Sequence, residues 1–220
     1  MIQHHLPDSL LAEHVAGTLP LALDVLVATH LALCPSCRAG TAALEEAAGA
    51  LLDAAPPIPG NDAANLEALL LRLDEPAPAL VAPPPPRQDT PPDPLFPAPL
   101  RYWTGPSAQL SWSTTVPGVA QRVVLPLELE GIPVTLEQMR PGKKVPRHGH
   151  DAPEMTLLLD GGYDDGAGQY RRGDVQVVGP EHEHALAIDD DGPCILLSMR
   201  MGERLPRELA AHIARWLGAL

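Results

Sequence analysis

The stretch GKKVPRHGHDAPEMTLLLDG, which runs from Gly142 to Gly161, decides the fold of the C-terminal half of this 220-residue chain. His148 and His150 are two residues apart, so on a β-strand both imidazoles point to the same face. Glu154 follows after a turn and can add a carboxylate to the two imidazoles. Imidazole and carboxylate groups are ligands that divalent transition metals accept. The stretch therefore predicts a metal site carried by short strands.

The spacing Gly-x5-His-x-His-x3-Glu-x6-Gly over this stretch resembles the first cupin sequence motif throughout. The second cupin motif is degenerate. Gly173 and His184 keep their places eleven residues apart, but three other positions depart from the usual pattern (Gly179, Glu181 and Ile188). The motif pair predicts a cupin fold in which the later histidine completes the metal site.

The expected ligands of this site are His148, His150, Glu154 and His184, with His182 as a weaker rival for the last position. Three imidazoles and one carboxylate accept zinc or another divalent transition metal with little discrimination. The alternative is a cupin that has lost its metal, but that would require ligand losses that the sequence does not show.

The C-terminal half also has the periodicity of an antiparallel β protein. Short apolar runs alternate with Gly, Pro and Asp turns, which favours an antiparallel β-barrel or jelly roll. The expected strands cover residues 121–127, 132–139, 155–160, 175–178, 185–188 and 194–199. A last amphipathic helix is expected over 206–217.

A proline-rich segment divides the chain. Eleven of the 24 residues from 76 to 99 are Pro, a density that neither a helix nor a central strand tolerates, so we expect an extended linker. The division gives residues 1–75 as a helical domain, 76–99 as the linker and 100–220 as the cupin domain. Such a linker predicts few contacts between the two halves.

Residues 1–75 read as four helices. Asp8 or Ser9 is expected to cap the first helix, which ends at Gly17. An unusually apolar second helix over 21–33 and a third from Pro35 to about Asp53 follow, and a fourth begins near residue 61. Its apolar stripe has helical spacing (Leu66, Leu69, Leu70 and Leu73). Four helices in 75 residues make a marginal core that calls for further stabilisation.

A second metal motif lies at the junction of the second and third helices. His30, Cys34 and Cys37 have the spacing His-x3-Cys-x2-Cys, which brings an imidazole and two thiolates together as tetrahedral zinc requires. His4 or His5 can supply the fourth ligand from the N-terminus. The alternative is that no metal binds here, and that a buried histidine lies beside two unrelated cysteines. A redox Cys-x-x-Cys motif would expect a preceding strand, whereas an apolar helix precedes this one.

Charge and composition exclude several classes of protein. The net charge is −13, and residues 1–75 hold ten Asp and Glu against two Lys and Arg. An acidic chain repels the phosphate backbone, which argues against direct binding to nucleic acid. The sequence lacks a signal peptide and any apolar run of transmembrane length, and three cysteines are too few for a disulfide scaffold. These features predict a cytoplasmic protein that does not associate with a membrane.

The whole chain resembles the ChrR family of zinc-dependent anti-sigma factors, which join an N-terminal zinc anti-sigma domain to a C-terminal cupin. The resemblance covers both domains and fails in the linker. The matching segments are His4-His5 with Asp8, Ala16-Gly17-Thr18-Leu19, Val27 to Leu31, Cys34-Pro35-Ser36-Cys37-Arg38, His148-Gly149-His150, Glu154 to Leu157 and Glu183-His184.

The resemblance implies that His5, His30, Cys34 and Cys37 bind zinc, and that the four cupin ligands expected above bind the second metal. It implies a regulator that binds an extracytoplasmic-function sigma factor and blocks its association with core RNA polymerase. Singlet oxygen or organic hydroperoxide, sensed at the cupin, would release the sigma factor.

One observation independent of the resemblance agrees with a protein partner. An acidic helical domain with a leucine stripe suits a basic, helical partner, although ordinary core packing explains the stripe equally well. The alternative function is a cupin metalloenzyme, a dioxygenase or an isomerase, that uses the cupin metal site. A DNA-binding repressor conflicts with the charge.

Overall fold

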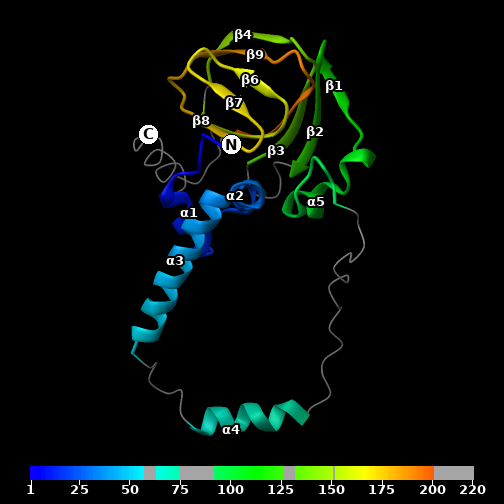
Figure 1. Cartoon of the computed structure of the whole chain (residues 1–220). Coiled ribbons are helices and arrows are strands. Elements are labelled where there is room, and N and C mark those ends of the chain that lie inside the picture. The colour runs from blue at the N-terminus through cyan, green and yellow to red at the C-terminus, as the bar shows by residue number, and fades with distance from the viewer. Residues whose placement is uncertain (57–62, 75–91, 126–131, 151, 201–220) are drawn as a thin grey trace. The chain divides into compact units, whose positions relative to one another are not determined.

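The computed structural model describes residues 1–56, 63–74, 92–125, 132–150 and 152–200 (Figure 1). The helices lie mostly in the N-terminal part of the chain. Their bounds are α1 Asp8–Val15, α2 Leu21–Leu33, α3 Pro35–Ala54, α4 Ala63–Leu71 and α5 Ala98–Thr104, with 3-10 turns at η1 Arg72–Asp74 and η2 Ser107–Gln109.

The four expected N-terminal helices are present, and Pro35 opens α3 as its rigid backbone favours. The predicted cap of α1 is wrong, because Pro7 precedes the helix and no side chain caps it. The helix α5 was not predicted, since the prolines around it masked its short apolar pattern. No single described helix is long and apolar enough to cross a membrane; α2 and α3 pass that test as a pair, but are bent by 115°.

The described chain separates into two compact units. Met1–Leu44 and the chain from Asp93 onward form the first unit, and Glu45–Pro92 forms the second. The second unit contains the end of α3 and all of α4.

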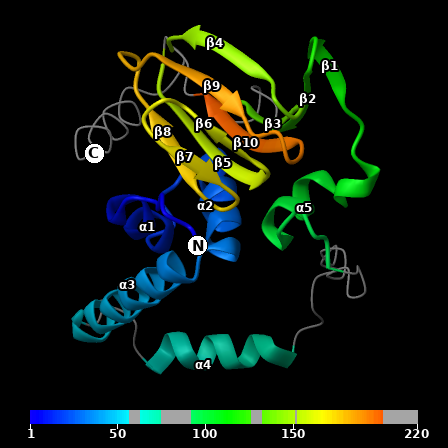
Figure 2. The same ribbon diagram turned by 45° about the horizontal axis from the view of Figure 1, so that its top comes forward.

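The C-terminal part of the first unit is a sandwich of two antiparallel sheets (Figure 2). The six-stranded sheet has the order β1-β2-β3-β10-β5-β8 and the four-stranded sheet the order β4-β9-β6-β7. The strands are β1 Ser113–Val116, β2 Val119–Leu125, β3 Val134–Met139, β4 Lys144–His148, β5 Glu154–Asp160, β6 Gly162–Asp164, β7 Gln169–Arg171, β8 Val175–Val178, β9 His184–Ile188 and β10 Cys194–Arg200.

The cupin-like antiparallel fold is thereby confirmed, but within the described residues the sheets form an open sandwich and not a closed barrel. Four strands escaped prediction for physical reasons. Strand β4 contains Pro146 and charged residues, which its place at a sheet edge tolerates. Strands β6 and β7 are three residues long, and β1 is exposed throughout. The helix expected over 206–217 lies outside the described residues.

The central strands of the six-stranded sheet are covered on both faces. Strand β10 is buried at every position except its last, whereas β9 alternates between buried and exposed residues. Continuous burial requires a cover on each side of a sheet. The four-stranded sheet covers one side. Helices α2 and α5 cover the other, because Leu26, Leu100 and Leu197 belong to one buried apolar cluster.

The expectation of few contacts between the N-terminal helices and the cupin half is therefore wrong. Helix α2 is buried nearly all round, which explains why its sequence is apolar along its whole length. The linker prolines say nothing about this packing, because a long extended segment allows the helices before it to return to the sheet after it.

Candidate metal centres

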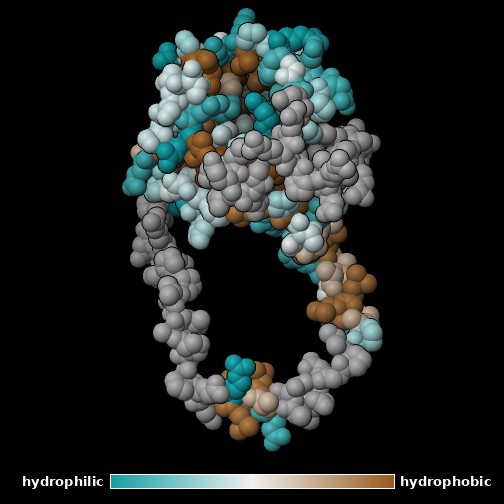
Figure 3. All heavy atoms as spheres, turned by 180° about the vertical axis from the view of Figure 1, so that it is seen from behind, coloured by the Kyte–Doolittle hydropathy of each residue, from teal (hydrophilic) through white to brown (hydrophobic). Residues whose placement is uncertain are grey.

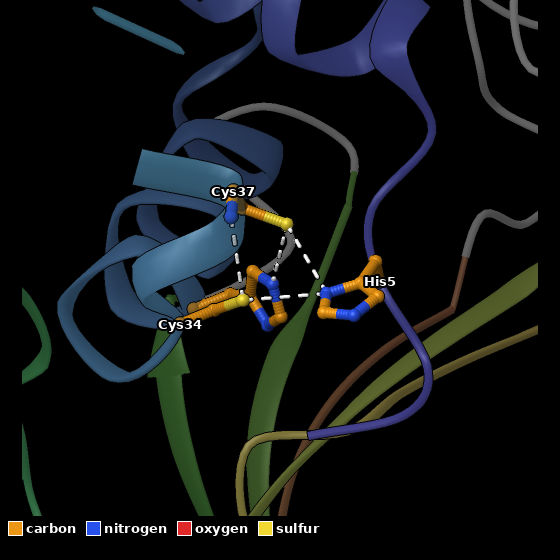
Figure 4. A group of neighbouring side chains, drawn as sticks. His5, Cys34 and Cys37 are labelled. Carbon is orange, nitrogen blue, oxygen red and sulfur yellow. Dashed lines mark hydrogen bonds between the residues drawn. The ribbon is translucent and has the colours of Figure 1, made fainter. Parts of the chain in front are cut away.

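Four side chains gather at the junction of α2 and α3, and we call them the thiolate site. They are His5, His30, Cys34 and Cys37, whose ligand atoms all lie within 4.8 Å of one another. His5 Nδ1 is 3.3 Å from Cys34 Sγ and 3.6 Å from Cys37 Sγ, and Figure 4 shows these three side chains converging. His30 Nε2 lies 3.2 Å from Cys37 Sγ. All four ligands expected from the family resemblance are thus brought together.

The local chain geometry explains this convergence. His30 lies in the last turn of α2, and the chain bends at Cys34, where the backbone is extended, before Pro35 starts α3. Cys37 is in the first turn of α3, so its thiol turns back toward His30, and its backbone N–H donates to Cys34 Sγ over 3.4 Å. The end of α2 and the start of α3 thus hold the ligand atoms of His30, Cys34 and Cys37 close together.

The choice between the N-terminal histidines is settled by their contacts. His5 faces the thiols, whereas the ring of His4 stacks on Tyr170 with centroids 4.3 Å apart. His4 therefore packs against the sandwich, and His5 is the N-terminal residue that can complete the thiolate site.

The protonation of the thiolate site suits a metal. Burial disfavours the imidazolium and lowers the pKa of His30 to about 4, so this ring is neutral. Its Nδ1–H donates to the carbonyl of Gly173 over 2.9 Å, which leaves the Nε2 lone pair directed at the thiols. Burial likewise raises the pKa of the Cys37 thiol to about 11, so a cation must displace this proton on binding. Two thiols and two imidazoles are a tetrahedral zinc set.

Three histidines meet between the two sheets, and together with Glu154 we call them the cupin site. The ligand atoms of His148, His150 and His184 lie within 4.8 Å of one another, and Nε2 of His150 is 3.1 Å from Nε2 of His184. His148 ends β4 and His184 begins β9, and these two residues are directly paired across the strands. Burial, and then the neighbouring imidazoles, lowers the pKa of His184 to about 4. Neutral rings are the form that binds a metal.

Glu154 lies beside this cluster and has other partners. Its carboxylate is 3.6 Å from His150 Nδ1, forms an ion pair with Arg200 at 2.6 Å and accepts a hydrogen bond from Thr156 over 3.4 Å. The structure thus brings the three expected histidines together. The expected carboxylate lies beside them but outside the group whose ligand atoms converge. Nothing in the sequence motif pointed to Arg200 as its partner.

The cupin site borders a cavity of about 210 Å³. His148, Glu154 and His184 contribute to its lining, as do Tyr163 and Gln176 from the two facing sheets. The Tyr163 hydroxyl donates to Gln176 over 2.8 Å, which gives the cavity a polar wall. A metal held here would be accessible to a small molecule in the cavity.

His182, the weaker candidate, belongs to a second cluster. Its ligand atom lies within 4.8 Å of those of Asp165 and His184. Because His182 is exposed and Asp165 is engaged by Gln176 and two backbone N–H groups, the three-histidine cluster is the better-formed of the two.

Comparison with known proteins agrees with both halves of this description. The family model of the ChrR cupin-like domain matches residues 104–201. The anti-sigma-E factor ChrR of Cereibacter sphaeroides is 34% identical over 215 residues, which cover 94% of this chain and 95% of the relative.

A solved structure extends the match to three dimensions. The crystal structure of Rhodobacter sphaeroides SigE in complex with the anti-sigma ChrR matches with a TM-score of 0.74 and 32% identity. The match covers 91% of this chain and all of the matched chain. Identity and coverage at this level include the N-terminal helices as well as the sandwich, and the chain belongs to the ChrR family of anti-sigma factors.

Proposed function

We propose that this chain is an anti-sigma factor that binds and inhibits an extracytoplasmic-function sigma factor and blocks its association with core RNA polymerase. The observation that carries the proposal is the match, over 91% of this chain, to ChrR in a complex with SigE. The same relationship favours a cytoplasmic regulator over a cupin metalloenzyme, although enzymes share the fold.

Exposed apolar residues in the second unit support the binding of a protein partner. On α4 and η1, the leucines 66, 69, 70 and 73 are 58, 56, 53 and 75% exposed, and Leu51 and Leu52 of α3 are about as open. Figure 3 shows apolar side chains along both helices. Apolar side chains exposed together along a helix are typical of an interaction site on a protein. Acidic residues around it would steer a basic partner toward it.

The thiolate site supports a structural zinc within a four-helix anti-sigma domain over residues 1–75. Zinc would be held by His5, His30, Cys34 and Cys37, and it would fix the α2–α3 junction and the N-terminal segment together. A closed set of two thiolates and two imidazoles leaves no position for a substrate, which is the character of a structural site.

The cupin domain, residues 100–220 after the linker 76–99, would be the sensor. Zinc or another divalent transition metal would be held by His148, His150 and His184, with Glu154 as the fourth ligand. A metal there supplies a Lewis acid beside a cavity, where singlet oxygen or an organic hydroperoxide can reach it. Reaction at this site would release the sigma factor.

The sharpest test of the sigma-factor contact is the double variant Leu69→Glu/Leu70→Glu in the full chain. The binding partner in this test would be an extracytoplasmic-function sigma factor from the same organism, and the measurement is its affinity by calorimetry. Charges placed in an apolar interface should weaken binding about 100-fold or more.

The matched control is Val123→Glu on β2, an apolar residue that is 54% exposed in the other unit. It should bind the sigma factor like the wild type. Wild-type affinity of the double leucine variant would refute the proposed contact, and failure of the wild-type chain to bind would refute the proposed function.

A further inference from the structure

The turn between β7 and β8, residues 171–175, lies against the N-terminal segment. In Figure 1 and Figure 2 the N-terminus lies next to these two strands. The turn itself is firmly placed, because Gly173 N–H donates to Leu158 O over 2.8 Å and Leu158 N–H donates to Asp174 O over 3.0 Å. It is therefore part of the sandwich, and it offers the N-terminal segment a rigid surface.

Asp174 binds the segment directly in front of His5. Its Oδ1 accepts the backbone N–H groups of Gln3 over 2.7 Å and His4 over 2.9 Å, while its Oδ2 accepts Arg171 N–H over 2.8 Å. The Asp174 residue is 2% exposed. A buried carboxylate that accepts three N–H groups is an anchor made for this segment, since chain termini otherwise fray.

Two further contacts extend the anchor to His4. Val175 N–H donates to His4 O over 3.1 Å, so this residue is held on both sides of its backbone. Its ring stacks on Tyr170 of β7. The residue that follows His4 is His5, whose direction toward the thiols is thereby set by the sandwich.

Gly173 supports a second ligand from the same turn. Its carbonyl accepts Nδ1–H of the fully buried His30, although the two residues are 143 apart in sequence. Its φ of +92° favours glycine, and a Cβ at this position would collide with the side chain of Ile2. Glycine thus allows the turn to approach both the N-terminal segment and α2.

We propose that the β7–β8 turn is the outer support of the thiolate site, with Asp174 as a positioning residue for His5 and the Gly173 carbonyl as the group that orients His30. One turn of the cupin sandwich thus positions both imidazole ligands of a metal bound by the helices. Groups that orient metal ligands in this way commonly change metal affinity by about 10- to 100-fold. The inference rests on the metal site proposed above.

The test uses the full chain loaded with Co²⁺ alone. Thiolate-to-cobalt charge transfer reports on the thiolate site, because among the described residues the cupin site has no cysteine ligand. We expect Asp174→Ala to lose this absorption to excess EDTA at least tenfold faster than the wild type. Asp174→Asn retains an oxygen for the Gln3 and His4 N–H groups and should recover most of the wild-type retention.

A second variant acts from the other side of the contact. Ile2 lies over Gly173 and belongs to no strand, so Ile2→Ala should leave the sandwich folded and still speed cobalt loss. The matched control is Asp164→Ala, which removes another carboxylate that accepts a turn N–H, here that of Gly166 in its own turn. Its cobalt loss should equal that of the wild type.

The outcomes separate the two proposals. Wild-type cobalt loss in both Asp174→Ala and Ile2→Ala would overturn the support role of the turn. Absence of the charge-transfer band from the wild-type chain would instead overturn the metal site itself. If Asp174→Ala does not fold, the rate of cobalt loss from Ile2→Ala supports or refutes the inference by itself.

Discussion

The thiolate site and the cupin site differ in whether all of their expected ligands face one another. All four ligands of the thiolate site face one another, and three of the four residues are buried. In the cupin site three imidazoles converge, but Glu154 is held by Arg200 and the site borders a cavity. The first arrangement can keep a metal for stability, and the second can change its ligands when a molecule enters.

The chemistry of the donors points in the same direction. A set of two thiolates and two imidazoles binds zinc tightly and fills its four coordination positions. A carboxylate that also pairs with an arginine is more easily displaced from a metal by another ligand. A protein that must both hold a fold and respond to a reagent can divide these tasks between two centres. Variants of the two sites, Cys37→Ser and Glu154→Ala, test whether this division is real.

The largest effect is expected from Cys37→Ser. Structural zinc contributes on the order of 10 kcal/mol, as much as the whole free energy of unfolding of a typical domain, so the loss of one ligand should unfold the N-terminal helices. Zinc content and the far-ultraviolet dichroism of the full chain measure this. Cys194→Ser makes the same change in the core between the sheets and should keep the zinc of the thiolate site. Unchanged zinc content and melting temperature in Cys37→Ser would contradict a structural metal.

Glu154→Ala should have a large effect of another kind. The cupin site should lose at least tenfold in metal affinity, as ligand changes in metal sites do, while affinity for the sigma factor stays at the wild-type value. In cells, a sigma-dependent reporter should then no longer respond to singlet oxygen or organic hydroperoxide. Full induction by these agents would remove the sensor role from the cupin site.

The control for this variant is Glu183→Ala. Glu183 is also paired with an arginine, Arg147 at 3.0 Å, but it is exposed and lies outside the three-histidine cluster. The reporter should respond normally in this variant. A loss of response in both variants would mean that general damage to the sandwich, and not the metal, explains the effect.

The smallest effect is expected outside both sites, at Asp93, and it calibrates the other two. Burial alone would raise the pKa of Asp93, but N–H groups of Phe96, Ser107 and Leu95 and the Ser107 hydroxyl outweigh it and lower the pKa from 3.8 to about 2. The carboxylate therefore stabilises the fold above about pH 4, and this contribution disappears as the pH falls toward 2.

We expect Asp93→Ala to lower the free energy of unfolding at pH 7 by about 1 kcal/mol, the usual value of a capping carboxylate, and the melting temperature by about 2–4 °C. Near pH 2 the variant and the wild type should melt together. A difference that persists at pH 2 would show that packing and not charge is responsible. Asp164→Ala, which removes a carboxylate that accepts one backbone N–H, should have less effect.

The sequence predicted the local parts of both sites well. His30, Cys34 and Cys37 are close along the chain, so the bend between α2 and α3 is enough to bring them together. His148 and His150 also converge, but β4 ends at His148 and His150 lies beyond the strand on which both were expected. The contacts that could not be predicted are those between distant segments that no motif or family resemblance marks. The pairing of Glu154 with Arg200 depends on strand register, and the turn at Asp174 looked like an ordinary connection.

The proline-rich segment shows the same limit for the fold. Its composition predicted a linker but gave no information on whether the helices before it pack on the sheet after it. The apolar character of α2 on all sides was the available signal, because a helix in a four-helix domain would leave one face polar. The sequence of α2 by itself indicated that the helix packs against something more than its neighbouring helices.

The hydrogen bond from His30 to Gly173 also orders events during synthesis. The ribosome completes the helices and both thiols while the β7–β8 turn is still more than a hundred residues from being made. At the usual rate of synthesis that interval is on the order of ten seconds. A metal bound to the helices at that stage would lack the support of the turn at both imidazole ligands. It would then exchange more readily with free metal ions than in the completed protein.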